Sequence, residues 1–139
     1  VNALIPGIKK LGYIHNDEIS MYVANAGACI LPSRLDQWGM ALHEYSQLAK
    51  PIIASQGCGA RHQFIVHGFN GYIFYDNSVT SLSLFMKHLS SLSTEELSLM
   101  GQRSLALSSA LSPDISAYSL LSILHKYYPD TSFMHMTYA

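Results

Sequence analysis

The sequence predicts an α/β domain in which helices cover a parallel sheet, and three observations lead to this fold class. Short apolar runs alternate with longer segments of helical period, which is the pattern of a Rossmann-like three-layer fold. The short runs are apolar throughout, as expected of parallel strands buried on both faces. The 139 residues are 49% hydrophobic and 12% charged, which suits one domain with its own core.

Four apolar runs of strand length are predicted strands: residues 10–14 (KLGYI), 28–31 (ACIL), 51–55 (PIIAS) and 72–75 (YIFY). Pro32 and Ser33 end the second of these strands. Gly68 and Gly71 mark a turn before the fourth strand.

Helices are predicted between and after these strands: residues 17–26, 39–49, a short stretch ending at Val66, 81–92, 94–111 and 113–128. Thr94, followed by two glutamates, is typical of a helix start, and Pro113 marks another. We expect residues 1–125 to form the domain and residues 126–139 to be a helix end and tail.

Composition excludes several classes of function. A net charge of -1 gives no basic excess for binding nucleic acid, so none is expected as a partner. No apolar run reaches the roughly 20 residues of a membrane-spanning helix, so no direct membrane insertion is expected. Two cysteines, Cys29 and Cys58, are too few for a disulfide framework, which favours reduced thiols and a cytoplasmic location. Cys58 with His62 and His67 is an incomplete zinc set, so no metal is expected.

The most informative segment is residues 31–51, LPSRLDQWGMALHEYSQLAKP. Ligands of parallel α/β sheets bind at the carboxyl ends of the strands, and here such a loop leads into a helix opened by Gly39. A helix start attracts anions such as a pyrophosphate, and glycine permits their close approach. Glu44 on that helix and Asp36 before it are placed to accept hydrogen bonds from sugar hydroxyls. The segment therefore predicts a nucleotide-sugar site.

Structural explanations exist for the same residues. Glu44 is also compatible with a solvated helix acid, and Asp36 with a helix cap. Gly57 and Gly59 are also explained by a turn.

The segment resembles the retaining glycosyltransferases of family 4, which have the GT-B fold. Their pattern is Pro-Ser, two residues, Glu, two residues, Gly, Leu or Met, three residues, Glu. The matching positions are Pro32, Ser33, Gly39, Met40 and Glu44. Asp36 stands where the family has Glu, and its carboxylate reaches roughly 1.5 Å less far. Further matches are residues 11–14 with the acids that follow, 49–53, 58–60 and 67–71, while Gln63 departs from a frequent Glu.

The resemblance implies a role for each matching residue. Glu44 would bind the donor ribose and Asp36 would lie beside the donor sugar. Backbone amides at Gly39 and Met40 would hold the diphosphate. Backbone groups at Ile14 and His15 would hold the base.

The resemblance also implies the function of a parent protein: transfer of a sugar from a UDP-sugar or GDP-sugar to an acceptor hydroxyl, with no cofactor. The chain corresponds to the C-terminal half of a GT-B enzyme. We expect it to be a fragment, inactive without its N-terminal acceptor domain. Bacterial surface polysaccharide synthesis at the inner membrane face is the expected setting. The alternatives are a GT-B-like epimerase or phosphorylase, and a non-catalytic nucleotide-binding or interaction domain.

Overall fold

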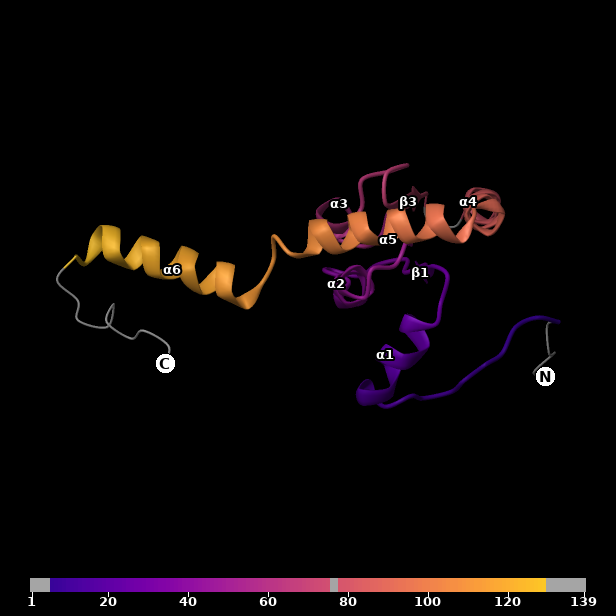
Figure 1. Ribbon diagram of the computed structural model, residues 1–139, viewed down its shortest axis with the longest axis horizontal. Coiled ribbons are helices and arrows are strands. Elements are labelled where there is room, and N and C mark those ends of the chain that lie inside the picture. Colours follow the sequence, from indigo (N-terminus) through magenta and orange to yellow (C-terminus); the bar gives the residue numbers. More distant parts are fainter. Residues whose placement is uncertain (1–5, 76–77, 130–139) are drawn as a thin grey trace.

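The computed structural model describes residues 6–75 and 78–129, and it has the α/β fold class that the sequence predicts (Figure 1). Its sheet consists of three parallel strands in the order β1-β2-β3: Cys29–Leu31, Ile52–Ser55 and Gly71–Phe74. Ile30 is paired with Ile53, and Ile53 with Tyr72. Each of these strands lies within one residue of its predicted bounds, because a short apolar run between turn residues leaves little choice of register.

The described residues form six helices: α1 (Asn16–Ala24), α2 (Met40–Gln47), α3 (Arg61–Phe64), α4 (Val79–Ser91), α5 (Thr94–Ser108) and α6 (Pro113–Tyr127). Capping explains two of the helix starts. The Ser93 hydroxyl accepts from Glu96 N–H while Glu96 accepts from Ser93 N–H, so a capping box opens α5. Ser112 caps α6, and Pro113 stands at its first position.

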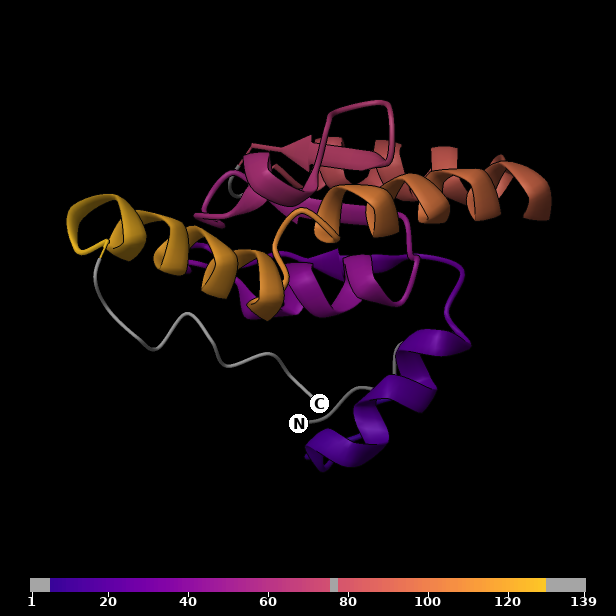
Figure 2. The same ribbon diagram turned by 60° about the vertical axis from the view of Figure 1, so that its left-hand side comes forward.

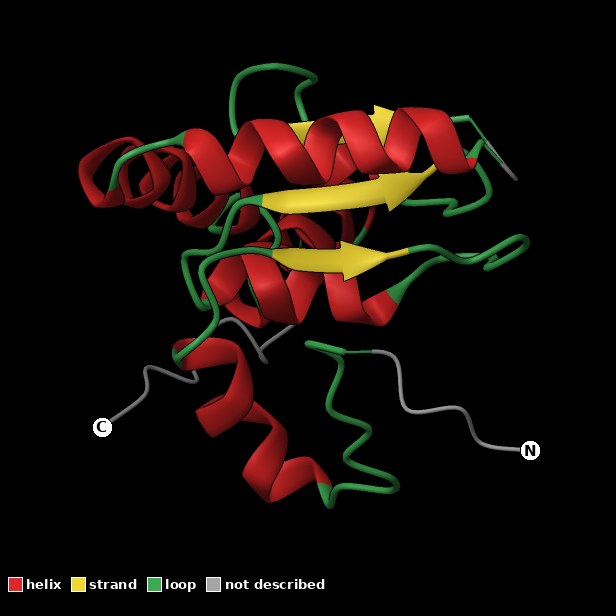
Figure 3. Ribbon diagram, turned by 90° about the vertical axis from the view of Figure 1, so that its right-hand side faces the viewer, coloured by secondary structure: helices red, strands yellow, loops and turns green. Residues whose placement is uncertain are grey.

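The core has one apolar cluster on each face of the sheet. On one face, Ile52 and Ala54 of β2 pack with Leu42 of α2 and Phe64 of α3. On the other face, Ile53 belongs to the cluster of Leu89 from α4 and Met100 from α5. Helices therefore cover both faces, as Figure 3 shows, and the domain has the three layers expected of a Rossmann-like half domain.

α5 approaches the end of α2 unusually closely. A Cβ atom at Gly101 would stand 2.0 Å from the carbonyl oxygen of Ala49. Only glycine permits this contact, which explains a residue that otherwise weakens a helix interior. Ala49 itself has φ 53°, in the left-handed region, where the chain turns from α2 toward β2.

The predicted strand at residues 10–14 is wrong. The structure has no strand in this segment, and β1 is the first strand of the described residues. Two of its apolar side chains are exposed, Leu11 at 41% and Tyr13 at 90%. A strand needs a neighbouring strand for its backbone groups, and none of the described strands pairs with this segment.

α6 lies apart from the sheet, and Figure 2 shows it extending from the end of α5. No residue of α6 is buried. The predicted boundary at residue 125 falls inside this helix, and residues 130–139 of the predicted tail lie outside the described residues. Among the helices that the structure describes, none is long and apolar enough to span a membrane.

Candidate functional site

The predicted site lies at the carboxyl edge of the sheet. The three strands run in the same direction in Figure 3, so the loops after β1 and β2 (residues 32–39 and 56–60) leave the sheet at the same edge. This is the edge at which parallel α/β sheets bind ligands.

These two loops are joined by backbone hydrogen bonds. Asp36 N–H donates to the Gly57 carbonyl at 3.0 Å, and Gly59 N–H donates to the Asp36 carbonyl at 2.8 Å. Ala60 N–H donates to the Trp38 carbonyl, also at 2.8 Å. The loop that carries Asp36 is thus held by the loop after the next strand.

The glycines of the second loop serve this contact. A Cβ atom at Gly57 would stand 2.2 Å from the Arg34 carbonyl oxygen, and one at Gly59 would stand 1.9 Å from that of Gln37. Neither glycine has a positive φ. Both glycines stand in a turn, and the close approach of the first loop is a further structural reason for glycine at these positions.

Gly39 precedes α2 in a conformation that favours glycine. Its φ of 88° and ψ of 62° lie in the left-handed region. Gly39 is the N-cap of α2, and no side chain of the described residues caps the helix. Met40 follows as the first helical residue, with a side chain that is 61% exposed. Uncapped N–H groups at a helix start attract anions.

Glu44 is exposed on α2 and lines a cavity of about 310 Å³ between α1 and α2. Asn16, the first residue of α1, lines the same cavity, as does Ser20 one turn later. The fold thus brings Glu44 beside the start of α1, which sequence spacing alone does not show. Asn16 is a candidate ligand to which the sequence analysis assigned no role of its own, although it directly precedes the helix predicted from residue 17.

Ile14 and His15 immediately precede Asn16 in the chain. Ile14 is half-buried and His15 is exposed. His15 is the N-cap of α1, and its carbonyl accepts from Glu18 N–H at 2.9 Å. Its Nδ1 lies 3.1 Å from the Asp17 carboxylate. Neither residue is among those that line the α1–α2 cavity, although Asn16, which follows His15 in the chain, is one of them.

Asp36 is half-buried, and one carboxylate oxygen accepts from Trp38 N–H at 3.2 Å. The alternative that Asp36 caps α2 is wrong, because no side chain caps that helix. Asp36 is not among the residues that line the Glu44 cavity. The two acids therefore belong to one edge of the sheet but not to one cavity.

The two thiols are free and buried. Burial raises the pKa of the Cys29 thiol to about 11, and the nearby Lys50 opposes this rise. Lys50 donates to the carbonyls of Ala24 and Ala26, at 2.6 and 2.9 Å, and so fixes the end of α1. Within residues 6–75 and 78–129, no group of three His, Cys, Asp or Glu side chains is placed to hold a metal.

Comparison with known proteins gives the family. Residues 3–103 match the family described as Glycosyl transferases group 1. An uncharacterized glycosyltransferase of Methanocaldococcus jannaschii is 29% identical over 90 residues, which are 65% of this chain and 25% of that relative. The chain thus matches about a quarter of the length of this curated relative. The family match covers more than half of the chain, so the chain belongs to the glycosyl transferases of group 1.

Proposed function

We propose that this chain is the donor-binding, C-terminal domain of a retaining glycosyltransferase of family 4. The parent enzyme transfers a sugar from a UDP-sugar or GDP-sugar to an acceptor hydroxyl, without a metal cofactor. An N-terminal acceptor domain completes the active site, and the parent works in the cytoplasm, at the membrane face where polysaccharides are made.

One observation carries this proposal: Glu44, in the second turn of the helix that the uncapped Gly39 opens, lines a cavity together with Asn16 at the start of α1. A nucleoside in this cavity has its ribose hydroxyls within reach of the Glu44 carboxylate. Its base then faces Ile14 and His15. Its phosphates extend toward the N–H groups that follow Gly39, where the helix dipole favours negative charge.

The chemistry that follows is electrostatic. The glycosidic bond to the donor phosphate breaks, and the leaving diphosphate gains charge that Gly39 and Met40 N–H groups stabilise. Asp36 binds a hydroxyl of the donor sugar through the carboxylate oxygen that Trp38 N–H leaves available. Closure of the acceptor domain over this edge excludes water.

The test is ligand-observed NMR binding of UDP, GDP and ADP to the full chain and to Glu44→Gln. Glu95→Gln is the matched control, since Glu95 is an exposed helical acid of α5. We expect one nucleotide to bind more tightly than the others, and Glu44→Gln to weaken it about tenfold or more. Equal binding by the chain and both variants would exclude Glu44 from the site.

The Asp36 carboxylate accepts a hydrogen bond from Trp38 N–H within its own loop. This local contact favours a second candidate function, a nucleotide-binding domain without catalysis. Turnover of the parent protein with Asp36→Ala and Asp36→Glu separates the two functions. An enzyme loses turnover in Asp36→Ala, whereas a nucleotide-binding domain has no turnover in any form.

A further inference from the structure

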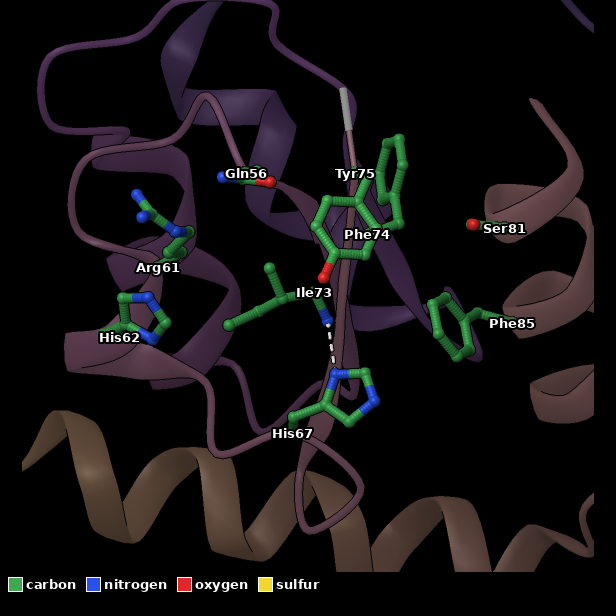
Figure 4. Close-up of a pocket in the computed structure, with 9 residues that line it drawn as sticks. All are labelled: Gln56, Arg61, His62, His67, Ile73, Phe74, Tyr75, Ser81 and Phe85. Carbon is green, nitrogen blue, oxygen red and sulfur yellow. Dashed lines mark hydrogen bonds between the residues drawn. The ribbon is translucent and has the colours of Figure 1, made fainter. Parts of the chain in front are cut away.

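A second cavity lies at the outer edge of β3, away from the α1–α2 cavity. Its volume is about 490 Å³, and it shares no lining residue with the cavity of Glu44. Figure 4 shows Arg61 and His62 on one side of it and Phe85 of α4 on the other. β3 passes between them and contributes Ile73 and Phe74, and Tyr75 follows directly after the strand.

Arg61 brings a charge to this cavity that has no counter-ion in the described chain. No carboxylate of the described residues pairs with its guanidinium, and no acid lines the cavity. One terminal N–H group donates to the Cys58 carbonyl at 2.9 Å, which holds the guanidinium in place. The buried Nε atom has no hydrogen-bond partner in the described part of the chain. Because the Nε atom is itself closed to solvent, a ligand acceptor would meet the guanidinium at its terminal N–H groups.

Further donors lie around the same space. The His62 imidazole lies next to Arg61, and the Gln56 side-chain amide lies at one end of the cavity (Figure 4). A fixed guanidinium fork with an imidazole and an amide suits the several oxygens of a phosphate better than the two of a carboxylate.

The remainder of the cavity suits an apolar or ring-shaped body. Phe85 stacks on Tyr72 with ring centroids 4.6 Å apart, so the far wall is a fixed aromatic surface. His67 is fixed as well, because its Nδ1 accepts from Ile73 N–H at 3.1 Å, the dashed line in Figure 4. Tyr75 also lines the cavity, and its side chain is 73% exposed.

We propose that this cavity, centred on Arg61, binds a phosphate monoester that carries an apolar or ring-shaped group. The site does not depend on the donor assignment of Glu44. It is nevertheless coupled to that edge of the sheet, because Cys58, whose carbonyl holds Arg61, belongs to the loop bonded to Asp36. A ligand bound to Arg61 is therefore connected, through Cys58, to the loop that carries Asp36.

The probe for this site is phenyl phosphate, titrated into the isotope-labelled full chain and followed by two-dimensional NMR. We expect saturable shifts of the Arg61 Nε–H and Gln56 side-chain amide signals. Phenol tests the phosphate requirement and should leave the Arg61 signal unchanged. Shifts centred on Met40 at the start of α2, or an equal response to phenol, would overturn the proposal.

Two arginine variants provide the matched comparison. Arg61 and Arg103 each donate to a backbone carbonyl at 2.9 Å, but Arg103 does not line the cavity. Arg61→Gln should weaken phenyl phosphate binding about tenfold, whereas Arg103→Gln and Glu44→Gln should leave it within about twofold. Arg61→Lys keeps the charge and should retain part of the affinity. Equal affinity in Arg61→Gln and Arg103→Gln would contradict the site.

Vesicles distinguish the two sources of such a phosphate. If the ligand is a lipid headgroup, phosphatidic acid vesicles retain the chain, Arg61→Gln releases it, and phosphatidylcholine vesicles do not bind it. If the ligand is a free phosphate ester, neither vesicle binds, and the saturable response to phenyl phosphate remains.

Discussion

The contact between the loops after β1 and β2 gives the sharpest prediction, through Gly59→Ala. The new Cβ atom would stand 1.9 Å from the Gln37 carbonyl oxygen, whereas ordinary carbon–oxygen contacts begin at about 3.3 Å. The loops must therefore separate by about 1.4 Å. A hydrogen bond that now measures 2.8 Å then stretches to about 4 Å, beyond the usual range.

Two hydrogen bonds are lost by this separation, those from Gly59 N–H to Asp36 and from Ala60 N–H to Trp38. Each is worth about 1 kcal/mol, and unsatisfied buried groups add to the loss, so we expect a destabilisation of about 2 to 4 kcal/mol. For a domain of this size the melting temperature should fall by roughly 10 °C. Binding of the donor nucleotide should also weaken, because the loop of Asp36 moves.

The control is Gly27→Ala. A Cβ atom at Gly27 meets only Leu97, at 3.9 Å, and Gly27 has no positive φ. Its melting temperature should stay near that of the unchanged chain or rise slightly. Differential scanning calorimetry measures the melting temperatures of Gly59→Ala and Gly27→Ala. Equal melting temperatures for the two variants would refute the steric explanation.

Three further substitutions test other parts of the fold. Lys50→Met removes the two hydrogen bonds to the end of α1, so amide hydrogen exchange should accelerate in α1 while α4 and α5 stay protected; unchanged exchange in α1 would contradict this. Ala49→Gly relieves a left-handed φ of 53° and should raise the free energy of unfolding by roughly 0.5 kcal/mol, and a lower urea midpoint would be the opposite result. Cys29 keeps its proton in the folded state up to a pKa of about 11 but loses it near 9 when unfolded. Stability should therefore fall as pH rises from about 9 to about 11, and urea titrations should show a shallower fall in Cys29→Ala; identical slopes would exclude Cys29 as a cause.

Local patterns were sufficient for most of the elements. β1, β2 and β3 follow from apolar runs between turn residues, and α5 follows from Thr94 and the two glutamates after it. The apolar run at residues 10–14 was misleading. Such a run shows that a segment can form a strand, but it does not show whether a partner strand is present.

The site was predictable in parts but not as an arrangement. The sequence predicts that Gly39 opens a helix at the carboxyl edge and that Glu44 lies in the second turn of this helix, and the structure agrees. The cavity that joins Glu44 to Asn16 depends on how α1 packs, and that packing depends on Lys50, more than twenty residues away in the chain. Such contacts between distant segments leave no periodic signal in the sequence.

The central claim is that the cavity between α1 and α2 holds the nucleotide of the donor. The most direct measurement is a map of backbone amide shifts in the full chain as the tightest-binding nucleoside diphosphate is added. We expect the largest shifts at Ile14, His15, Gly39 and Met40, and their loss in Glu44→Gln. Saturable shifts confined to other parts of the chain, such as Arg61 and the edge of β3, would contradict the claim.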